Sequence, residues 1–332
     1  MIELSKDMDP VILLDYLLDR QIVEKQPTTC EIEVPGEGNM NVVLRLRYDD
    51  RSVIIKQSKP FVRKYPAIAA PLERLLTEAR YYQYCQDVES IRTMSPGLLH
   101  IDPDNFILVL EDLGEGSDLT SAYQLSSQLT QSDVEHLINY ISALHSLEWS
   151  ESQIAEFPEN LKLRKLNHQH IFVLPYRSDN GFDLDSVQPG LAKVASQYID
   201  KEAVMRKATE LGELYLGPGK ILLHGDYYPG SWLRTREGIK VIDPEFSFMG
   251  LGEFDLSVFL AHGMMARMDQ KYLLRSLQTY YHPWTKLDSD LVEAFAGIEI
   301  FRRIIGLAQL PLDLSLVEKT ELLEQAYHMA AI

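Results

Sequence analysis

Hydrophobic and polar positions divide the chain into a first part with mostly strand-like patterns and a longer second part with mostly helical patterns. Residues 8–20 and 71–86 carry apolar side chains at helical spacing, which predicts an amphipathic helix in each range. From 30 to 57 the pattern predicts three strands, two with a period of two and a third that is a compact β-branched run. Two further strands are predicted at 97–101 and 106–110.

An acidic segment with glycines, residues 111–116, follows the last of these strands and predicts a boundary between two lobes. We therefore expect an N-terminal lobe of residues 1–112 and a C-terminal lobe of residues 113–332. In the second lobe, Ser132 and Asp133 are candidate caps of a helix that continues to about residue 147. Further helical patterns occupy 191–215, 253–266, 270–281 and 289–309.

Residues 221–245 interrupt the helical part with two short apolar runs, each of which is followed by acidic residues. The first run precedes Asp226, and the second precedes Asp243 and Glu245. A carboxylate beside a hydrophobic core must be solvated, paired or bound to a cation. One small strand–loop–strand unit that presents three acids therefore indicates a divalent metal and a proton acceptor. An extended backbone would place Asp243 and Glu245 on the same side.

Glycines and asparagines lie between the first two predicted strands, in the segment PGEGNMN at residues 35–41. Gly36 and Gly38 permit unusual dihedral angles and close approach of the backbone, and Asn39 favours a turn. The segment fits the tip of a hairpin, and it also fits a glycine-rich loop that lies over phosphates.

Lys56 lies inside a β-branched strand, a position where lysine is uncommon. It needs an anionic partner if it is buried, whereas at a sheet edge its stem can lie on the protein with the ammonium in water. Glu73 and Glu78 of the following helix are both candidate partners.

Arg302 and Arg303 are adjacent in a strongly apolar predicted helix. Neighbouring residues of a helix point in different directions, so both cannot face solvent when the rest of the helix is buried. At least one needs a buried anionic partner. An internal salt bridge satisfies this requirement, and so does a place beside a bound substrate.

Composition narrows the class of protein. The formal net charge of −17 over 332 residues argues against nucleic acid as a partner, because phosphate backbones are bound by clustered lysine and arginine. Cys30 and Cys85 have no metal-type spacing and indicate a reducing compartment. The first residues lack the basic region of a signal peptide, and no uncharged run approaches membrane-spanning length. We expect a cytoplasmic protein with no membrane partner.

The order of these features resembles the protein-kinase-like fold, in the branch of aminoglycoside phosphotransferases and choline kinases. Within that branch the chain is most similar to the methylthioribose kinase family. Six segments carry the resemblance and occur in the expected order: GEGNMN at 36–41, IIKQ at 54–57, LEDL at 110–113, HGDYYPGS at 224–231, VIDPEFSFMGLGEFD at 241–255 and FRRIIGLA at 301–308. The resemblance implies an α+β fold with two lobes, in which a small N-terminal lobe holds an antiparallel sheet and the C-terminal lobe is mainly helical.

The resemblance also implies roles in phosphoryl transfer, a reaction that depends on positioning and charge neutralisation. Asp226 would orient the acceptor hydroxyl and take its proton. Lys56 would contact the phosphates of ATP, with Glu78 as its partner. Asp243 and Glu245 would bind Mg²⁺ as a D-x-E pair.

Further roles follow for the nucleotide and the acceptor. The loop with Gly36, Gly38 and Asn39 would lie over the phosphates, and the backbone of Glu111, Asp112 and Leu113 would meet adenine. Arg302 and Arg303 would lie near the substrate sugar.

One departure from the wider branch concerns the metal site. Many relatives have asparagine five residues after the catalytic aspartate, and this chain has Ser231. The methylthioribose kinase pattern tends to show serine at this place. Ser231 either joins the metal ligands, with Glu245 compensating for the weaker oxygen donor, or only fills space.

These features predict a kinase that phosphorylates a hydroxyl of a sugar-like small molecule, with 5-methylthioribose as the first candidate acceptor. The alternatives within the superfamily are an aminoglycoside, choline or homoserine kinase, and outside catalysis a pseudokinase that binds nucleotide. A hydrolase that uses Asp226 and Asp243 as its acids leaves Lys56 and the glycine loop unexplained. Residues 151–190, which would shape the acceptor pocket, match the family poorly. A homodimer is compatible with the sequence, which does not determine the oligomeric state.

Overall fold

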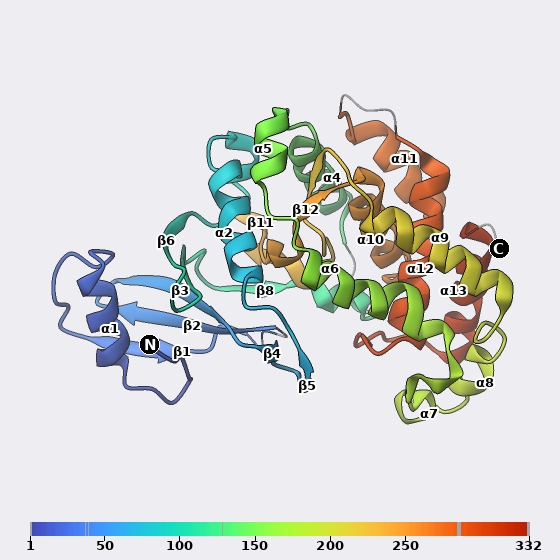
Figure 1. Ribbon diagram of the computed structural model, residues 1–332, viewed down its shortest axis with the longest axis horizontal. Coiled ribbons are helices and arrows are strands. Elements are labelled where there is room, and N and C mark those ends of the chain that lie inside the picture. The colour runs from blue at the N-terminus through green and yellow to red at the C-terminus, as the bar shows by residue number, and fades with distance from the viewer. Residues whose placement is uncertain (1, 37, 39, 128, 284–286, 331–332) are drawn as a thin grey trace.

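The structure of the protein, a computed structural model, describes residues 2–36, 38, 40–127, 129–283 and 287–330. Strands gather at the N-terminal end of the molecule, and helices form most of the remainder (Figure 1). The expected α+β architecture, with an antiparallel sheet in the N-terminal region and a helical C-terminal part, is confirmed.

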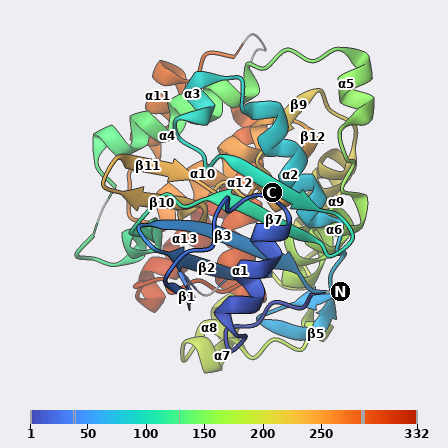
Figure 2. The same cartoon turned by 90° about the vertical axis from the view of Figure 1, so that its left-hand side faces the viewer.

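The N-terminal sheet is antiparallel and has the strand order β1–β2–β3–β7–β6. In that order the strands are Cys30–Glu33, Asn41–Tyr48, Arg51–Ser58, Ile107–Glu111 and Leu98–Asp102. Alternation along the strands separates two faces. Val53 and Ile55 pack with helix α1 (Pro10–Asp19), whereas Leu108 and Leu110 pack with α2 (Arg74–Cys85). Figure 2 shows α1 across the near face of the sheet.

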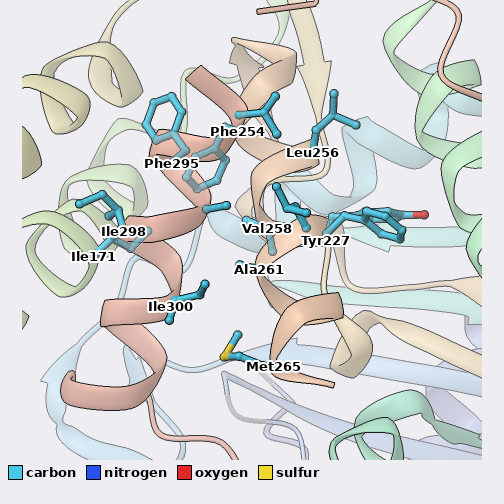
Figure 3. Close-up of a cluster of buried hydrophobic side chains, with 14 of the residues drawn as sticks. Ile171, Tyr227, Phe254, Leu256, Val258, Ala261, Met265, Phe295, Ile298 and Ile300 are labelled. Atoms are coloured by element: carbon cyan, nitrogen blue, oxygen red, sulfur yellow. The ribbon is translucent and has the colours of Figure 1, made fainter. Parts of the chain in front are cut away.

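Helices α10 (Gly252–Met265) and α12 (Ser289–Ile305) form the centre of the helical part. Figure 3 shows their apolar side chains meeting, among them Phe254 and Val258 from α10 and Phe295 from α12. Both helices are buried on nearly all sides, as expected for helices without a polar face. The elements that hold the site are therefore attached to a rigid core.

The remaining helices and the separate two-stranded sheet of β4 and β5 complete the two parts of the molecule. They are β4 (Phe61–Val62), β5 (Tyr65–Ala69), α3 (Glu89–Arg92), α4 (Gln131–His145), α5 (Glu151–Glu156), α6 (Leu161–His168), α7 (Leu184–Val187), α8 (Leu191–Ala195), α9 (Glu202–Leu216), α11 (Gln270–Tyr280) and α13 (Leu316–Met329). No helix in the described ranges has the length and apolar character needed to cross a membrane.

The helical range 191–215 holds two helices, α8 and α9. Two other predicted helix boundaries were wrong. The last predicted range ends at Ile305, where Gly306 leaves the helical conformation, and not at 309. The cap of α4 is Thr130, whose hydroxyl accepts from the amide of Asp133 while the Asp133 carboxylate accepts from the amide of Thr130. This reciprocal capping box leaves Ser132 outside the cap.

Two small sheets carry the acidic segment, and the prediction of one strand–loop–strand unit was wrong. Strand β9 (Ile221–Leu223) pairs with β12 (Phe248–Gly250), a strand that comes after the acids. Strand β10 (Trp232–Thr235) pairs with β11 (Gly238–Val241) and with β8 (Gly116–Asp118). The loops after β9 and β11 therefore start from different sheets.

Candidate active site

Lys56 lies on β3 between Val43 of β2 and Leu108 of β7, and only 5% of its surface is exposed. Its Nζ atom is 2.6 Å from Oε1 of Glu78 on α2, which is fully buried. Glu73, the other candidate partner, lies at the surface and contacts Lys162 at 2.9 Å. Glu78 is therefore the residue that pairs with Lys56.

Lys56 also contacts Oδ1 of Asp243, so the ammonium joins the sheet to the acidic segment. Burial alone lowers the pKa of Lys56, but the two carboxylates outweigh this and raise it above its usual value. Lys56 is therefore a charged group that lies between the five-stranded sheet and the loop of Asp243, which follows β11.

Asp243 follows β11 in a left-handed conformation with φ of 64°, and Pro244–Phe246 form a 3₁₀ turn. The backbone is not extended here, so the argument from alternation was wrong. The side chain of Asp243 is 43% exposed and faces solvent beside Lys56. Its carboxylate is accessible to a cation.

Glu245 is held at the start of β2. Its Oε2 atom accepts from Nδ2 of Asn41 at 3.0 Å and lies 3.1 Å from Nε of the fully buried Arg74. Oε1 has no hydrogen-bond partner among the described residues. Burial raises the pKa of Glu245 to about 8, because an isolated carboxylate is poorly solvated there. A cation at Oε1 would favour the ionised form.

The loop after β9 presents Asp226, and the fully buried Asp255 of α10 anchors this loop through hydrogen bonds. The Asp255 carboxylate accepts from the amide of His224 at 2.7 Å and from the amide of Gly225 at 2.9 Å. His145 contacts the same carboxylate at 3.2 Å. Two anchored amides determine the direction in which Asp226 leaves the strand.

Gly225 is required by this loop. Its φ of 83° belongs to the left-handed region, and a Cβ atom would lie 2.2 Å from the carbonyl oxygen of Phe246. The imidazole of His224 is fully buried and its Nε2 donates to the carbonyl of Ile242 at 3.0 Å. This bond ties the loop of Asp226 to the residue before Asp243.

Ser231 is 2% exposed, and its hydroxyl donates to the backbone carbonyl of Asp226 at 2.9 Å. The hydroxyl oxygen keeps lone pairs that can accept or bind a cation. Within the described ranges, no three acidic, histidine or cysteine side chains converge as a ready-made metal group.

Arg302 and Arg303 are both buried, and both contact Glu299 one turn earlier on α12. Arg302 also donates to Oδ1 of Asn167 at 3.2 Å. Arg303 reaches Oδ1 of Asp226 at 3.4 Å. The predicted anionic partner is Glu299, and Arg303 also lies beside Asp226. A place beside a bound substrate stays a prediction.

Burial raises the pKa of Asp226, while the positive charges of Arg303 and Arg302 partly oppose this. A carboxylate with a raised pKa is a better proton acceptor than a free one. Asp226 is partly exposed at the floor of a cavity, so an acceptor hydroxyl can approach it.

A first cavity of about 410 Å³ lies between the sheet and the C-terminal part. The residues at its wall include Lys56, Asp243 and apolar side chains of β2, β3 and β7, namely Val43, Ile54 and Leu110. Of the predicted nucleotide residues the cavity brings together Gly36, Gly38, Glu111, Asp112 and Leu113. Asn39 lies outside the described residues. The carboxylate of Asp112 is held by Arg45 at 2.8 Å, which leaves the backbone of this segment for a ligand.

A second cavity of about 330 Å³ contains Asp226, Ser231, Glu245, Arg302 and Arg303. The two cavities share only four of their lining residues, Gly38, Asp118, Gly230 and Asp243. A ligand in one cavity would meet a ligand in the other beside Asp243.

Several residues of the second cavity were not predicted. Asn167 and His170 come from the range 151–190, which matches the family poorly. There α6 continues into a π-helical turn at Gln169–Val173. Val62, Tyr65 and Ile68 come from the β4–β5 hairpin. Asp255 was also missed as an anchor, although it lies in the quoted segment EFD. Its role depends on contacts with residues thirty positions away, which no local pattern reveals.

Comparison with known proteins agrees with this geometry. A model of the phosphotransferase enzyme family matches residues 31–288, which is most of the chain. The chain belongs to this family. The predicted superfamily, the enzyme class and the protein-kinase-like fold are thereby confirmed: this phosphotransferase acts on an alcohol group of a small molecule.

Among proteins of known name, the chain is similar to methylthioribose kinases. The chain is 26% identical to a methylthioribose kinase of Exiguobacterium sibiricum, over 92% of this chain and 87% of the relative. It is 27% identical to a methylthioribose kinase of Bacillus cereus, over 96% of this chain and 89% of the relative.

Solved structures share the fold of this phosphotransferase at lower identity. A spectinomycin phosphotransferase in complex with ADP and spectinomycin has a TM-score of 0.56 at 13% identity, with 98% of each chain covered. A choline/ethanolamine kinase family protein from Mesorhizobium loti has a TM-score of 0.52 at 14% identity, with 98% of this chain and 96% of that chain covered.

Proposed function

We propose that this phosphotransferase transfers the γ-phosphate of ATP to a hydroxyl of a sugar-like substrate, and that 5-methylthioribose is the first candidate. One observation carries the proposal: the cavity with Asp226 and Arg303 meets the cavity with Lys56 at Asp243. Such a junction suits a direct transfer between two bound ligands. The methylthioribose kinase relatives, matched over about nine-tenths of the chain, support this acceptor.

The first cavity is the proposed ATP site. Val43, Ile54 and Leu110 offer apolar contacts to an adenine ring, and the backbone of 111–113 offers polar groups beside them. Lys56, held by Glu78, supplies positive charge for the phosphates. Gly36 and Gly38 lie at the same cavity, where side chains would obstruct close approach of the backbone.

Asp243, Glu245 and Ser231 fit a Mg²⁺ site. Asp243 is exposed, Glu245 has one unpaired oxygen among the described residues, and Ser231 keeps its lone pairs. Mg²⁺ in kinases is bound through one or two carboxylates together with phosphate oxygens and water. When bound, the ion would neutralise charge on the phosphates. Asn41 and Arg74 fix the position of Glu245 for this purpose.

Asp226 is the proposed base. It orients the acceptor hydroxyl and takes its proton as the oxygen bonds to phosphorus. Arg303 lies beside Asp226 and would stabilise charge on the transferring phosphoryl group.

The second cavity offers polar and apolar contacts to an acceptor. Its wall carries charges of both signs, because Arg302 and Arg303 lie there together with the carboxylates of Asp226 and Glu245. Asn167 and His170 can hydrogen-bond hydroxyls, and Ile68 with its hairpin neighbours offers an apolar contact. This combination suits a neutral sugar with an apolar substituent.

A substrate panel tests the proposal. ATP consumption would be measured with methylthioribose, choline, homoserine and spectinomycin, with and without Mg²⁺, and the Asp226→Asn variant would serve as the control. We expect Mg²⁺-dependent turnover of methylthioribose, and none by the variant, which still binds ATP. If only choline or spectinomycin is turned over, methylthioribose is the wrong acceptor and that compound takes its place in the proposal. No thermal stabilisation by ATP with Mg²⁺ would refute the kinase assignment of this site.

A further inference from the structure

A continuous line of side-chain contacts runs from Asp226 into the helical core. Arg303 reaches Asp226 at 3.4 Å, and its Nε donates to Oε1 of Glu299 at 2.6 Å. The same Oε1 is 3.1 Å from Nε2 of His262 on α10. Nδ1 of His262 is 2.6 Å from the hydroxyl of Tyr123. His262 and Tyr123 are fully buried and touch neither cavity, so substrate contact does not explain them.

The hydrogen-bond partners on the two sides of His262, Glu299 and Tyr123, determine which of its ring nitrogens carries the proton. Burial raises the pKa of Glu299, but Arg302 and Arg303 hold it well below its usual value, so Glu299 is ionised and accepts from His262 Nε2–H. Burial lowers the pKa of His262 to about 4, so the imidazole is neutral. Nδ1 then accepts from the Tyr123 hydroxyl, which selects a single tautomer.

Glu299 also sets the position of the two arginines. Each guanidinium contacts it, and Arg303 is held through Nε, which leaves a terminal nitrogen for Asp226 at a longer distance. An arginine without this restraint would form a close pair with Asp226. A close pair would weaken Asp226 as a proton acceptor.

We propose that Glu299, held by His262 and Tyr123, is a positioning residue that restrains Arg303 beside Asp226 in the geometry required for transfer. The proposal rests on the proposed function, in which Asp226 is the base. It assigns a role to three buried polar residues that would otherwise only destabilise an apolar core.

Four variants test the line of contacts, each assayed with the acceptor that the wild-type enzyme turns over. Glu299→Gln removes the charge, His262→Phe removes both nitrogens, His262→Gln restores a donor toward Glu299, and Tyr123→Phe removes one oxygen. Tyr16→Phe is the matched control, because Tyr16 is buried and its hydroxyl donates to Asp102 at 2.9 Å, away from both cavities.

We expect Glu299→Gln to lower kcat about 10- to 100-fold, the range for one hydrogen bond to a charged group, with KM for ATP within about twofold of wild type. His262→Phe should lower kcat about tenfold, and His262→Gln should recover most of this loss. Tyr123→Phe should have a smaller effect in the same direction. Tyr16→Phe should lower Tm and leave kcat unchanged.

A purely structural role would change Tm without changing kcat per folded molecule. If Glu299→Gln and Tyr123→Phe keep wild-type kcat while Tm falls, the proposal is overturned. The proposal is also overturned if kcat of His262→Gln is no higher than kcat of His262→Phe. Should either histidine variant not fold, kcat of Tyr123→Phe decides the question. A wild-type protein that phosphorylates no acceptor would instead overturn the proposed function, and this inference with it.

Discussion

Replacing Glu78 by glutamine tests the buried ion pair that holds Lys56. Glu78 is fully buried, Lys56 is 5% exposed, and their charged atoms are 2.6 Å apart. Glutamine keeps the shape and one acceptor oxygen but removes the charge. Lys56 then retains only one ion pair, that with Asp243, which the proposed metal site also requires.

The magnitude follows from the two partners of Lys56. Breaking a buried pair completely costs about 3–5 kcal/mol, and a hydrogen bond to a charged group contributes about 1.5–3 kcal/mol. The lower range applies, because Asp243 remains and because burial raises the pKa of Glu78, which shows that its charge is itself costly. We expect a loss of about 2 kcal/mol. This corresponds to about 30-fold in kcat/KM for ATP, and to a fall of about 3 °C in Tm for a chain of this length.

Steady-state kinetics at varied ATP and thermal unfolding of the same preparations measure both effects. Asp102→Asn is the control, because Asp102 is a buried carboxylate of the same sheet that pairs with Arg20 at 2.8 Å, outside both cavities. We expect the control to lose stability and to keep wild-type kcat/KM. A Glu78→Gln enzyme with unchanged kcat/KM for ATP would refute the role of this pair in nucleotide binding.

Three other outcomes are expected. Gly225→Ala should lose more than about 4 kcal/mol of stability or fail to fold, because its Cβ would lie 2.2 Å from the Phe246 carbonyl oxygen; a normal Tm would contradict this. Asp255→Asn should lower kcat at least about tenfold with little change in ATP affinity, because one loop amide loses a charged acceptor. Turnover assays measure kcat, and stopped-flow nucleotide binding measures the affinity for ATP. The pKa of His262 is lowered to about 4 in the folded protein, below its ordinary value of about 6.5, so the unfolded chain binds more protons between these pH values. The free energy of unfolding should therefore fall by up to about 3 kcal/mol as the pH falls from 6.5 to 4, and His262→Gln should remove this part of the slope in urea titrations.

Local patterns were sufficient for the elements that carry the nucleotide residues. The β-branched run before Lys56 predicts a strand, and helical spacing with a buried face predicts the helix that holds Glu78. Choosing Glu78 over Glu73 required the family resemblance, because both belong to the predicted helix 71–86 and its period alone does not show which of them faces Lys56. The contact at 2.6 Å agrees with that choice.

The geometry of the acidic segment depended on information that no local pattern contains. Asp243 adopts a left-handed conformation before Pro244, so counting alternate residues misplaced its relation to Glu245. The partner of β9 is β12, which lies beyond the acids in the sequence. Both features depend on pairing between distant segments.

The acceptor cavity was the least predictable part for the same reason. His170 lies in a π-helical turn, where one additional residue shifts the register of side chains around the helix. Its place at the cavity wall depends on that shift. The hairpin with Tyr65 reaches the cavity from the opposite part of the molecule.

The junction of the two cavities has a stereochemical consequence. Each cavity has its own wall and they meet at Asp243, so the proposed donor and acceptor could be bound at once, and neither ligand would have to leave before the other enters. Transfer in such a ternary complex is a single in-line displacement without a phosphorylated enzyme. A chiral γ-phosphate would therefore emerge with its configuration at phosphorus inverted.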